Sequence, residues 1–489
     1  MSEGARMNVN KQRYSVAVLI AAGLALVMIS GCMVGPEYHP PEPAVVPPAW
    51  EGVSKIPKDQ PYIATAQPAD LTQWWRQFND PILNELVDEA IKANLNLKIA
   101  EASLRQARAL RGIAIGALWP SVAASGSYQR LHDAATMPSN LTEDLYQAGL
   151  DAVWELDLFG GIRRNVESAG ANVQAAIENI RDVQVSIIAE VALDYIQLRG
   201  YQQQIVIAQN NLKAQEHTAD ITRRLDVGGF DSALDVAEAE SNVATTESQI
   251  PVLETSAQQS IYALSVLLAQ PPAALLSKLS PAVSIPKVPA KIPAGLPSDL
   301  LRRRPDIRQS EAQLHAATAQ IGVAVAQLFP SFSLTGSVNW QSSMLRDWWT
   351  NAGRSFSFGP SANWPVFQGG AIISNVRLQE ALRDQAFINY QNTVLAAFQD
   401  VENALIAFNK EQQHRKSLSD AVIANQKSVD LSLQLFTEGQ IEFLNVLEAQ
   451  LSLYTSQNAL VQSEDNIAAD LIALYKALGG GWESMPSGN

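Results

Sequence analysis

The sequence has very little cysteine and histidine, and no excess of positive charge. Of its 489 residues one is cysteine and five are histidine, and the histidines are scattered without metal-ligand spacing. We therefore expect no disulfide within the chain, no metal site and no cofactor. No nucleotide-binding loop or catalytic constellation is present, so we do not expect an enzyme. The formal net charge of -14 gives nucleic-acid binding no electrostatic support.

One short basic stretch, "LLRRRPDIRQSEAQL" (300–314), does not change this reading. Pro305 and Asp306 within it are typical of a helix start. We expect the neighbouring arginines to be solvated or paired with acidic side chains.

Aromatic residues are scarce, and proline is absent over long distances. The chain is 47% hydrophobic but only 7% aromatic, a composition that suits helix packing. No proline occurs from 139 to 250 or from 366 to 485, and such runs favour very long helices. The expected helices cover about 160–227, 231–269, 370–438 and 442–478. The first of them would be about 100 Å long if it is continuous.

Proline is concentrated in two other segments. Ten of the 25 prolines lie between Pro36 and Pro81, so we expect an extended leader over residues 32–80. A second cluster predicts a linker over 271–297, and residues 481–489 form a tail.

The N-terminus has the pattern of an export signal. Lys11 and Arg13 precede the apolar run "YSVAVLIAAGLALVMISGC", which is too short to span a membrane comfortably. Residues 29–32, Ile-Ser-Gly-Cys, resemble a bacterial lipobox. We expect a signal peptide over 1–31 and a lipid on Cys32, namely S-diacylglycerol plus an N-acyl chain, which suffices for stable anchoring. The alternative is a buried, unmodified cysteine behind an ordinary signal peptide.

The second half of the chain repeats the first at an offset of 210 residues. The segment "EASLRQARALRGIAIGALWPSVAASGS" (101–127) aligns with "EAQLHAATAQIGVAVAQLFPSFSLTGS" (311–337), and twelve of the 27 positions are identical. We place repeat 1 at 81–270 and repeat 2 at 298–480, with a helix over about 298–328 at the start of the second.

Each repeat also contains two stretches with the period of a strand. In "FPSFSLTGSVNW" (329–340) apolar residues alternate with Ser, Thr and Asn, which predicts one apolar and one polar face. The expected strands cover about 120–130, 145–158, 331–341 and 354–366. Five aromatic residues lie in or beside them, where a membrane interface would place them: Tyr128, Tyr146, Trp154, Trp340 and Trp364.

Four strands of this length match tilted membrane strands, but they cannot close a pore alone. An open sheet leaves unpaired backbone groups in lipid. Closure must therefore come from other copies, and a water-filled lumen favours the twelve strands of a trimer. The alternative is a pair of hairpins that pack on a soluble helical domain.

These features together resemble the TolC-like outer-membrane efflux factors, and more narrowly their lipoprotein, NodT-type branch. The resemblance rests on the lipobox, "WWRQFNDPILNELVDEAIKANLNLKIAEASL", the duplication and the ending "LYKALGGGW". It implies a long α-helical periplasmic barrel that continues into an outer-membrane β-barrel of four strands per protomer. It further implies a homotrimer that acts as the exit duct of a multidrug efflux system in a Gram-negative outer membrane. The implied partners are outer-membrane lipid, a periplasmic adaptor and an inner-membrane transporter, commonly proton-driven.

The resemblance also implies roles for residues at the helix tips. The matching adaptor-contact positions are Val227, Gly228, Gly229, Phe230, Glu438, Gly439 and Gln440. Asn445 and Glu448 match the positions that line the closed periplasmic aperture in the family. Some members carry Asp where this chain has Asn445, so the acidic ring is weaker here. In the alternative reading, Glu448 is a solvated helix residue and the tips are plain helix connections.

Two other functions remain open at this point. An exit duct for a type I-like secretion system would have the same fold. A lipid-anchored periplasmic coiled-coil scaffold without a pore is a different class, and it would not need strands with apolar faces. The sequence does not identify the substrate.

Overall fold

The computed structural model describes residues 33–41, 46–54, 63–65, 71–132, 142–289, 291–293 and 295–484. The expected signal peptide and Cys32 lie outside these residues. Two compact units make up the chain, and each takes residues from both repeats. Unit 1 comprises Met1–Glu42, Ser103–Ala176 and Gln309–Tyr390, and unit 2 comprises Pro43–Ala102, Ile177–Arg308 and Gln391–Asn489.

Four helices supply residues to both units: α4 (Leu95–Gly116), α5 (Gly161–Val227), α9 (Pro305–Ala326) and α10 (Ala371–Thr437). The two longest, α5 and α10, have 67 residues each. Their bounds lie within one residue of the ranges expected from the proline-free runs.

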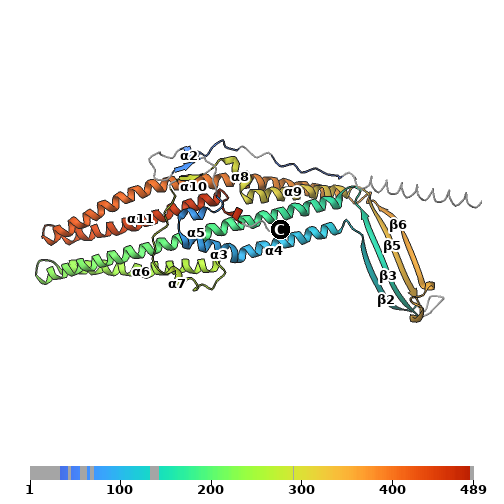
Figure 1. Ribbon diagram of the computed structural model, residues 1–489, viewed down its shortest axis with the longest axis horizontal. Coiled ribbons are helices and arrows are strands. Elements are labelled where there is room, and N and C mark those ends of the chain that lie inside the picture. The colour runs from blue at the N-terminus through green and yellow to red at the C-terminus, as the bar shows by residue number, and fades with distance from the viewer. Residues whose placement is uncertain are drawn as a thin grey trace, which may run out of the picture. The chain divides into compact units, whose positions relative to one another are not determined.

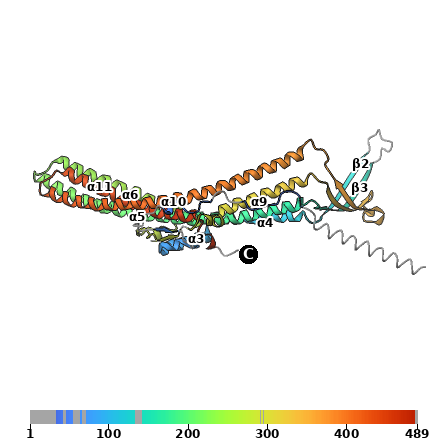
Figure 2. The ribbon, with the colours of Figure 1, turned by 90° about the horizontal axis from the view of Figure 1, so that it is seen from above.

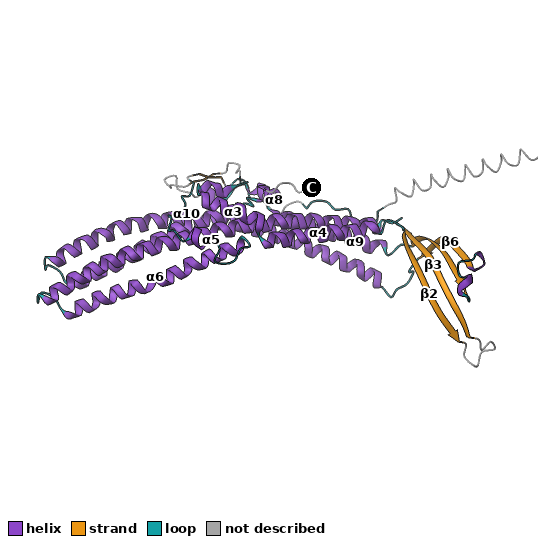
Figure 3. Cartoon of the chain, turned by 60° about the horizontal axis from the view of Figure 1, so that its bottom comes forward, coloured by secondary structure: helices purple, strands orange, loops and turns teal. Residues whose placement is uncertain are grey.

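Unit 1 contains one antiparallel sheet with the strand order β2-β3-β5-β6 (Figure 3). Its strands are β2 (Ser121–His132), β3 (Thr142–Leu156), β5 (Ser331–Ser342) and β6 (Arg354–Asn363). The short 3-10 helices η2 (Leu345–Asp347) and η3 (Asn351–Gly353) lie between β5 and β6. The last strand ends at Asn363 and not near 366 as expected, because Pro365 follows and has no N–H to continue the pairing. Pro360 is tolerated within β6 because β6 is an edge strand.

Unit 2 is built mainly from helices. Its elements are α2 (Glu51–Ser54), η1 (Trp74–Phe78), α3 (Pro81–Ala93), α6 (Ala233–Leu267), α7 (Leu276–Leu279), α8 (Pro297–Arg303), α11 (Phe443–Ala477), η4 (Trp482–Ser484) and the parallel pair β1 (Ile63–Thr65) and β4 (Lys291–Pro293). Helix α6 turns back along α5, and α11 turns back along α10 (Figure 1, Figure 2). Trp74, Trp75, Tyr195 and Tyr475 are among its largest fully buried side chains.

None of the helices in the described ranges has the length and apolar character needed to cross a membrane.

The helix expected over 298–328 is interrupted in the structure. Helix α8 ends at Arg303 and α9 begins at Pro305. Arg304 has extended backbone angles, φ -68° and ψ 122°, because a residue before proline is excluded from the helical region. The equivalent position in repeat 1, Asn94, separates α3 from α4 with similar angles, φ -54° and ψ 133°, although leucine and not proline follows it.

Both breaks are fastened by a side chain to the end of a long helix. The Asn94 amide donates to the Leu267 carbonyl at 2.8 Å, and the Arg304 guanidinium donates to the Ala477 carbonyl at 3.1 Å. The two acceptors are themselves 210 residues apart, so the duplication has preserved the contact. Asn94 also caps α4, since its Oδ1 accepts from the Asn96 N–H at 2.8 Å.

Replacement of Asn94 should therefore destabilise unit 2. Asn94→Ala removes the α4 cap and leaves the Leu267 carbonyl without this donor, so we expect the free energy of unfolding to fall by about 1–3 kcal/mol. The measurement is denaturant unfolding of the detergent-solubilised protein followed by circular dichroism. Asn96→Ala, an exposed neighbour, is the control and should leave the midpoint unchanged. Equal effects of both variants would contradict the role of the Asn94 side chain.

Candidate functional site

The sheet of unit 1 has two chemically different faces. Residues paired directly across antiparallel strands point to the same face. Leu334 lies between Trp154 and Pro360 in the register, and the next row on the same face contains Ala152, Gly336 and Phe358. The row after that contains Leu150, Val338 and Phe356. This confirms the alternation that the sequence predicts.

The opposite face carries hydroxyl and amide side chains. The hydroxyls of Ser333 and Ser361 are 2.7 Å apart, and those of Ser337 and Ser357 are 2.9 Å apart. Such cross-strand hydroxyl pairs fix the register without burying apolar surface. In the single chain the apolar face is left open, since Phe358 is 84% exposed.

Two of the predicted interface aromatics lie where the strands meet the helices. The Trp154 indole N–H donates to the Leu118 carbonyl at 2.9 Å. The Trp364 indole N–H donates to the Leu328 carbonyl at 3.0 Å. The second donor, Trp364, and its acceptor, Leu328, each lie 210 residues after their counterparts in the first contact. Because each acceptor follows the last turn of α4 or α9, these bonds fix the rings at the helical end of the sheet.

The other three predicted aromatics lie toward the far end of the sheet. Tyr128 and Tyr146 are register partners, with ring centroids 5.0 Å apart. Trp340 packs on Trp349 at 5.4 Å. Eight residues separate Tyr146 from Trp154, which is about 27 Å along a strand. For a strand tilted by about 40° this is about 20 Å along the membrane normal, a few ångströms less than the roughly 25 Å apolar band between the aromatic girdles of membrane barrels.

Sequence reasoning missed Trp348 and Trp349. They follow β5 in a segment without alternation, so a search for strands passes over them. Trp348 is 6.2 Å from Tyr146, centroid to centroid, and 5.1 Å from Trp349. The adjacent tryptophans in "RDWWTN" were the available signal.

The two predicted contact tips of unit 2 have the same backbone design. Gly229 and Gly439 have φ angles of 75° and 72°. In each case the next residue donates its N–H to a carbonyl five positions back, Phe230 to Leu225 and Gln440 to Leu435, at 2.9 Å. This is the Schellman ending of a helix, which requires a residue with positive φ and hence favours glycine.

The side chains of the two tips differ. Val227 and Phe230 are 84% and 85% exposed, whereas the equivalent positions of the second tip hold Thr437 and Gln440. Burial, followed by the adjoining Asp235 carboxylate, raises the pKa of Asp231 to about 6. The first tip thus combines exposed apolar groups with an acidic pair.

A hydrophobic cluster joins both hairpins below the tips. Ala219 and Ala239 of the first hairpin pack with Phe436, Phe443 and Val446 of the second. The rings of Phe436 and Phe443 are 5.5 Å apart. This cluster holds the two tips in one arrangement within unit 2.

The predicted aperture residues lie just beyond that cluster on α11. Asn445 and Glu448 are exposed and lie one turn apart on the same side of the helix. Val446, between them in sequence, is fully buried. Asn445 donates from its amide to the Glu442 carbonyl at 3.3 Å. Within the described residues, no donor or cation engages the Glu448 side chain, which leaves it available to solvent or a partner.

The first part of the leader, residues 33–41, is fastened to unit 1. The Val34 N–H donates to the Phe159 carbonyl at 3.1 Å, and the Arg164 Nε donates to the Val34 carbonyl at 3.2 Å. Further along, the Tyr38 ring stacks on His315 at 4.1 Å. The leader is therefore held where β3 ends and α5 begins.

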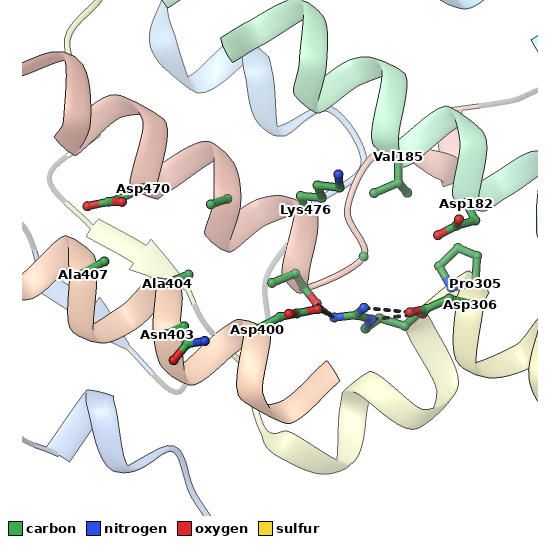
Figure 4. A pocket seen from close by; sticks show the side chains of 14 residues that line it. Asp182, Val185, Pro305, Asp306, Asp400, Asn403, Ala404, Ala407, Asp470 and Lys476 are labelled. Atoms are coloured by element: carbon green, nitrogen blue, oxygen red, sulfur yellow. Dashed lines mark hydrogen bonds and ion pairs between the residues drawn. The ribbon is translucent and has the colours of Figure 1, made fainter. Parts of the chain in front are cut away.

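Unit 2 contains a charged cavity of about 460 Å³ (Figure 4). Arg304 donates to Asp306 at 2.7 Å and to Asp400 at 3.0 Å. Burial, then the charge of Asp306, raises the pKa of Asp182. Arg303 and Arg308 also pair with acids, Glu483 at 3.1 Å and Glu178 at 2.8 Å. These arginines are therefore paired with acidic side chains, one of the two outcomes expected from the sequence, and the pairs cross-link unit 2.

Two aspartates of unit 2, the buried Asp465 and the half-buried Asp470, form no ion pair within the described residues. Asp465 is 8% exposed and accepts one hydrogen bond, from Gln462 at 3.3 Å. Burial raises its pKa to about 6. Asp470 lines the cavity, and burial together with Glu411 raises its pKa to about 6. Across the described part of the chain, no cluster of three or more His, Cys, Asp and Glu side chains is arranged to hold a metal ion.

The chain is similar to known proteins along almost its whole length. A family model described as "outer membrane efflux protein" matches residues 86–270 and 296–480, two segments offset by 210 residues (296 − 86). Nodulation protein T of Rhizobium leguminosarum bv. viciae is 33% identical over 466 residues, which make up 95% of this chain and 93% of that protein. Toluene efflux pump outer membrane protein TtgC of Pseudomonas putida is 32% identical over 470 residues, 95% of this chain and 96% of that protein.

Among solved structures, the outer-membrane channel OprN matches with a TM-score of 0.84 and 34% identity, over 92% of this chain and 100% of that chain. The predicted fold class, mainly helical with a small membrane-type sheet and an internal duplication, is confirmed by these matches.

The buried state of Asp465 predicts a pH-dependent stability. Its folded pKa is raised above the ordinary 3.8, so the folded state prefers the protonated form and loses stability as the pH rises from about 4 to about 6. Asp465→Asn should raise the free energy of unfolding by about 1–3 kcal/mol at pH 7.5 and by little at pH 4.

Thermal unfolding at both pH values measures this effect. Asp420→Asn, the same change at an exposed site, serves as the control. A gain of equal size at pH 4 and pH 7.5 would show that titration of Asp465 is not its cause.

Proposed function

The chain belongs to the outer membrane efflux protein family, and on that premise we propose that three copies assemble into one exit duct. The observation that carries this proposal is the four-stranded sheet with one apolar and one polar face. Its edge strands, β2 and β6, would leave unpaired backbone groups in lipid. A ring of three sheets pairs every edge, with apolar side chains toward lipid and hydroxyls toward water.

As a member of this family, the protein is an outer-membrane efflux channel that spans the outer membrane and extends into the periplasm. We propose that a periplasmic adaptor and a proton-driven inner-membrane transporter complete the pump. The channel conducts passively and is not an enzyme. It uses no cofactor, and energy comes from the transporter.

The substrates that we propose are small toxic compounds, including apolar ones. The relative TtgC is named a toluene efflux pump protein. Hydroxyl and amide side chains on the polar face offer a water-filled path without a binding pocket. A channel wall of this kind lets substrates pass without selecting among them, so the transporter would determine which substrates are exported.

Cys32 is proposed to carry the lipid anchor. Val34, two residues further on, is bonded to Phe159 at the helical end of β3. This contact supports an anchor close to the aromatic girdle of Trp154 and Trp364, where acyl chains reach the membrane directly.

Glu448 is proposed to line the periplasmic aperture. Three copies of an exposed carboxylate around a narrow axis would attract cations. In planar bilayers we expect discrete pores for the wild-type protein, blocked by divalent cations from the periplasmic side. Glu448→Gln should weaken this block by about five- to tenfold, because each lost charge reduces the attraction. The measurement is single-channel conductance.

The control for this experiment is Glu238→Gln, since Glu238 is the repeat partner of Glu448 (448 − 210) and is half-buried. A complete absence of pores from folded protein would contradict the channel function. Unchanged block in Glu448→Gln would contradict only the aperture role.

The first tip is proposed to dock the adaptor through Phe230. An exposed aromatic side chain is a common anchor of protein interfaces, and its truncation often weakens binding by tenfold or more. Phe230→Ser should therefore reduce cross-linking to the adaptor and increase drug susceptibility of cells, with the single-channel conductance unchanged. Val252→Ser, at an exposed apolar site along α6, should have no effect. Full efflux with Phe230→Ser would exclude Phe230 as an anchor.

A further inference from the structure

The apolar face of the sheet contains a groove of about 480 Å³. All four strands contribute to it. Val122 comes from β2, Leu150 from β3, Val338 from β5, and Phe356 and Phe358 from β6. Its volume lies in the range of small-molecule sites, roughly 300–1,000 Å³.

The floor of the groove is formed where side chains are smallest. Gly336 is the register partner of Ala152 on one side and of Phe358 on the other. A Cβ atom at Gly336 would have its nearest contacts at 4.0 Å, to Phe358 Cβ and the Ser357 carbonyl. The backbone therefore tolerates a larger residue, and glycine at this position keeps the groove open.

One charged residue borders this apolar groove. Arg354 lines it and is the register partner of Trp340. The other two arginines near this end of the sheet have acidic neighbours, Arg130 with Asp144 at 3.9 Å and Arg346 with Asp347 at 3.5 Å. In the described ranges, no acidic side chain pairs with the exposed Arg354 guanidinium.

The surroundings indicate the kind of ligand. Trp340 and its neighbour Trp349 lie at the far aromatic girdle, where membrane headgroups would be found. An apolar groove that ends in a free cation at this level is complementary to an acyl chain joined to an anionic headgroup. Ser337 and Ser357 also line the groove, but their hydroxyls hydrogen-bond to each other at 2.9 Å, so the groove offers few free polar partners to a water molecule.

We propose that this groove binds one anionic membrane lipid, with its acyl chain along Val338 and Phe356 and its phosphate on Arg354. The proposal rests on the proposed membrane orientation of the sheet. In this site Arg354 selects the anionic headgroup, and the lack of a side chain at Gly336 leaves space for the acyl chain. Each protomer would carry one such site.

Native mass spectrometry of the full-length protein in detergent tests this site. The probes are palmitoyl-oleoyl phosphatidylglycerol, the phosphatidylcholine with the same chains, and inorganic phosphate. We expect the anionic lipid to bind about fivefold more tightly than the zwitterionic one, since one basic side chain near a membrane surface contributes about that factor. Inorganic phosphate should not displace the lipid.

Two variants separate the headgroup from the chain. Arg354→Gln should abolish the preference while both lipids still bind. Gly336→Leu should fill the groove and weaken both lipids by tenfold or more. Gly126→Leu is the matched control, because Gly126 lies on the same face outside the groove and a Cβ there has its nearest contact at 3.8 Å.

Three results would overturn the proposal: an intact preference in Arg354→Gln, unchanged lipid binding in Gly336→Leu, or displacement of the lipid by inorganic phosphate. Arg354 is exposed, so its variant tests the site even if Gly336→Leu fails to fold. Single-channel conductance of all variants is recorded in parallel. If the wild-type protein forms normal pores but shows no lipid preference, the lipid site is contradicted and the channel function is not. If the wild-type protein forms no pores, the proposed channel is contradicted, and lipid binding can still be measured.

Discussion

The requirement that backbone N–H and C=O groups be paired in lipid governs this chain more than any single side-chain contact. Each group left unpaired in hydrocarbon costs several kcal/mol. The sheet of unit 1 pairs its inner strands, β3 and β5, on both sides, whereas β2 and β6 have one open edge each. Pro360 on β6 removes one donor from its strand. The proposed trimer meets this requirement, because each open edge would pair with the sheet of a neighbouring copy.

The duplication is visible in individual contacts that recur in both halves of the chain. The bond from Trp154 to Leu118 is repeated as the bond from Trp364 to Leu328, and the helix breaks at Asn94 and Arg304 are fastened in the same way. Where the two halves have different residues at these breaks, the local charge differs as well. At the first break, the neutral Asn94 amide introduces no charge. At the second break, the Arg304 guanidinium forms ion pairs with Asp306 and Asp400, and these charged side chains line a cavity.

The sequence alone predicts the long helices and the two faces of the strands, but it does not predict the contacts between these elements. The long helices follow from proline-free runs, and the faces of the strands follow from alternation, because both are local properties. Pro305 and Asp306 are correctly predicted to start a helix, whereas the single helix predicted over 298–328 is wrong, because the proline forces the preceding Arg304 out of the helix. The role of Arg354 depends on its register with Trp340 and on the absence of a nearby acid in the described ranges, which only the paired strands reveal. The compact units could not be foreseen either, because each combines segments from both repeats.

The two helix tips show why a duplicated scaffold can hold two different surfaces. Their backbones end in the same Schellman geometry around Gly229 and Gly439, so a partner meets the same shape twice per chain. Their side chains are not equivalent, because Phe230 is replaced by Gln440 at the matching position. A partner that used only shape would bind both tips equally. An adaptor that also needs an apolar anchor, as we propose, would engage the first tip in full and the second only through polar contacts, and this difference would set its register around the channel.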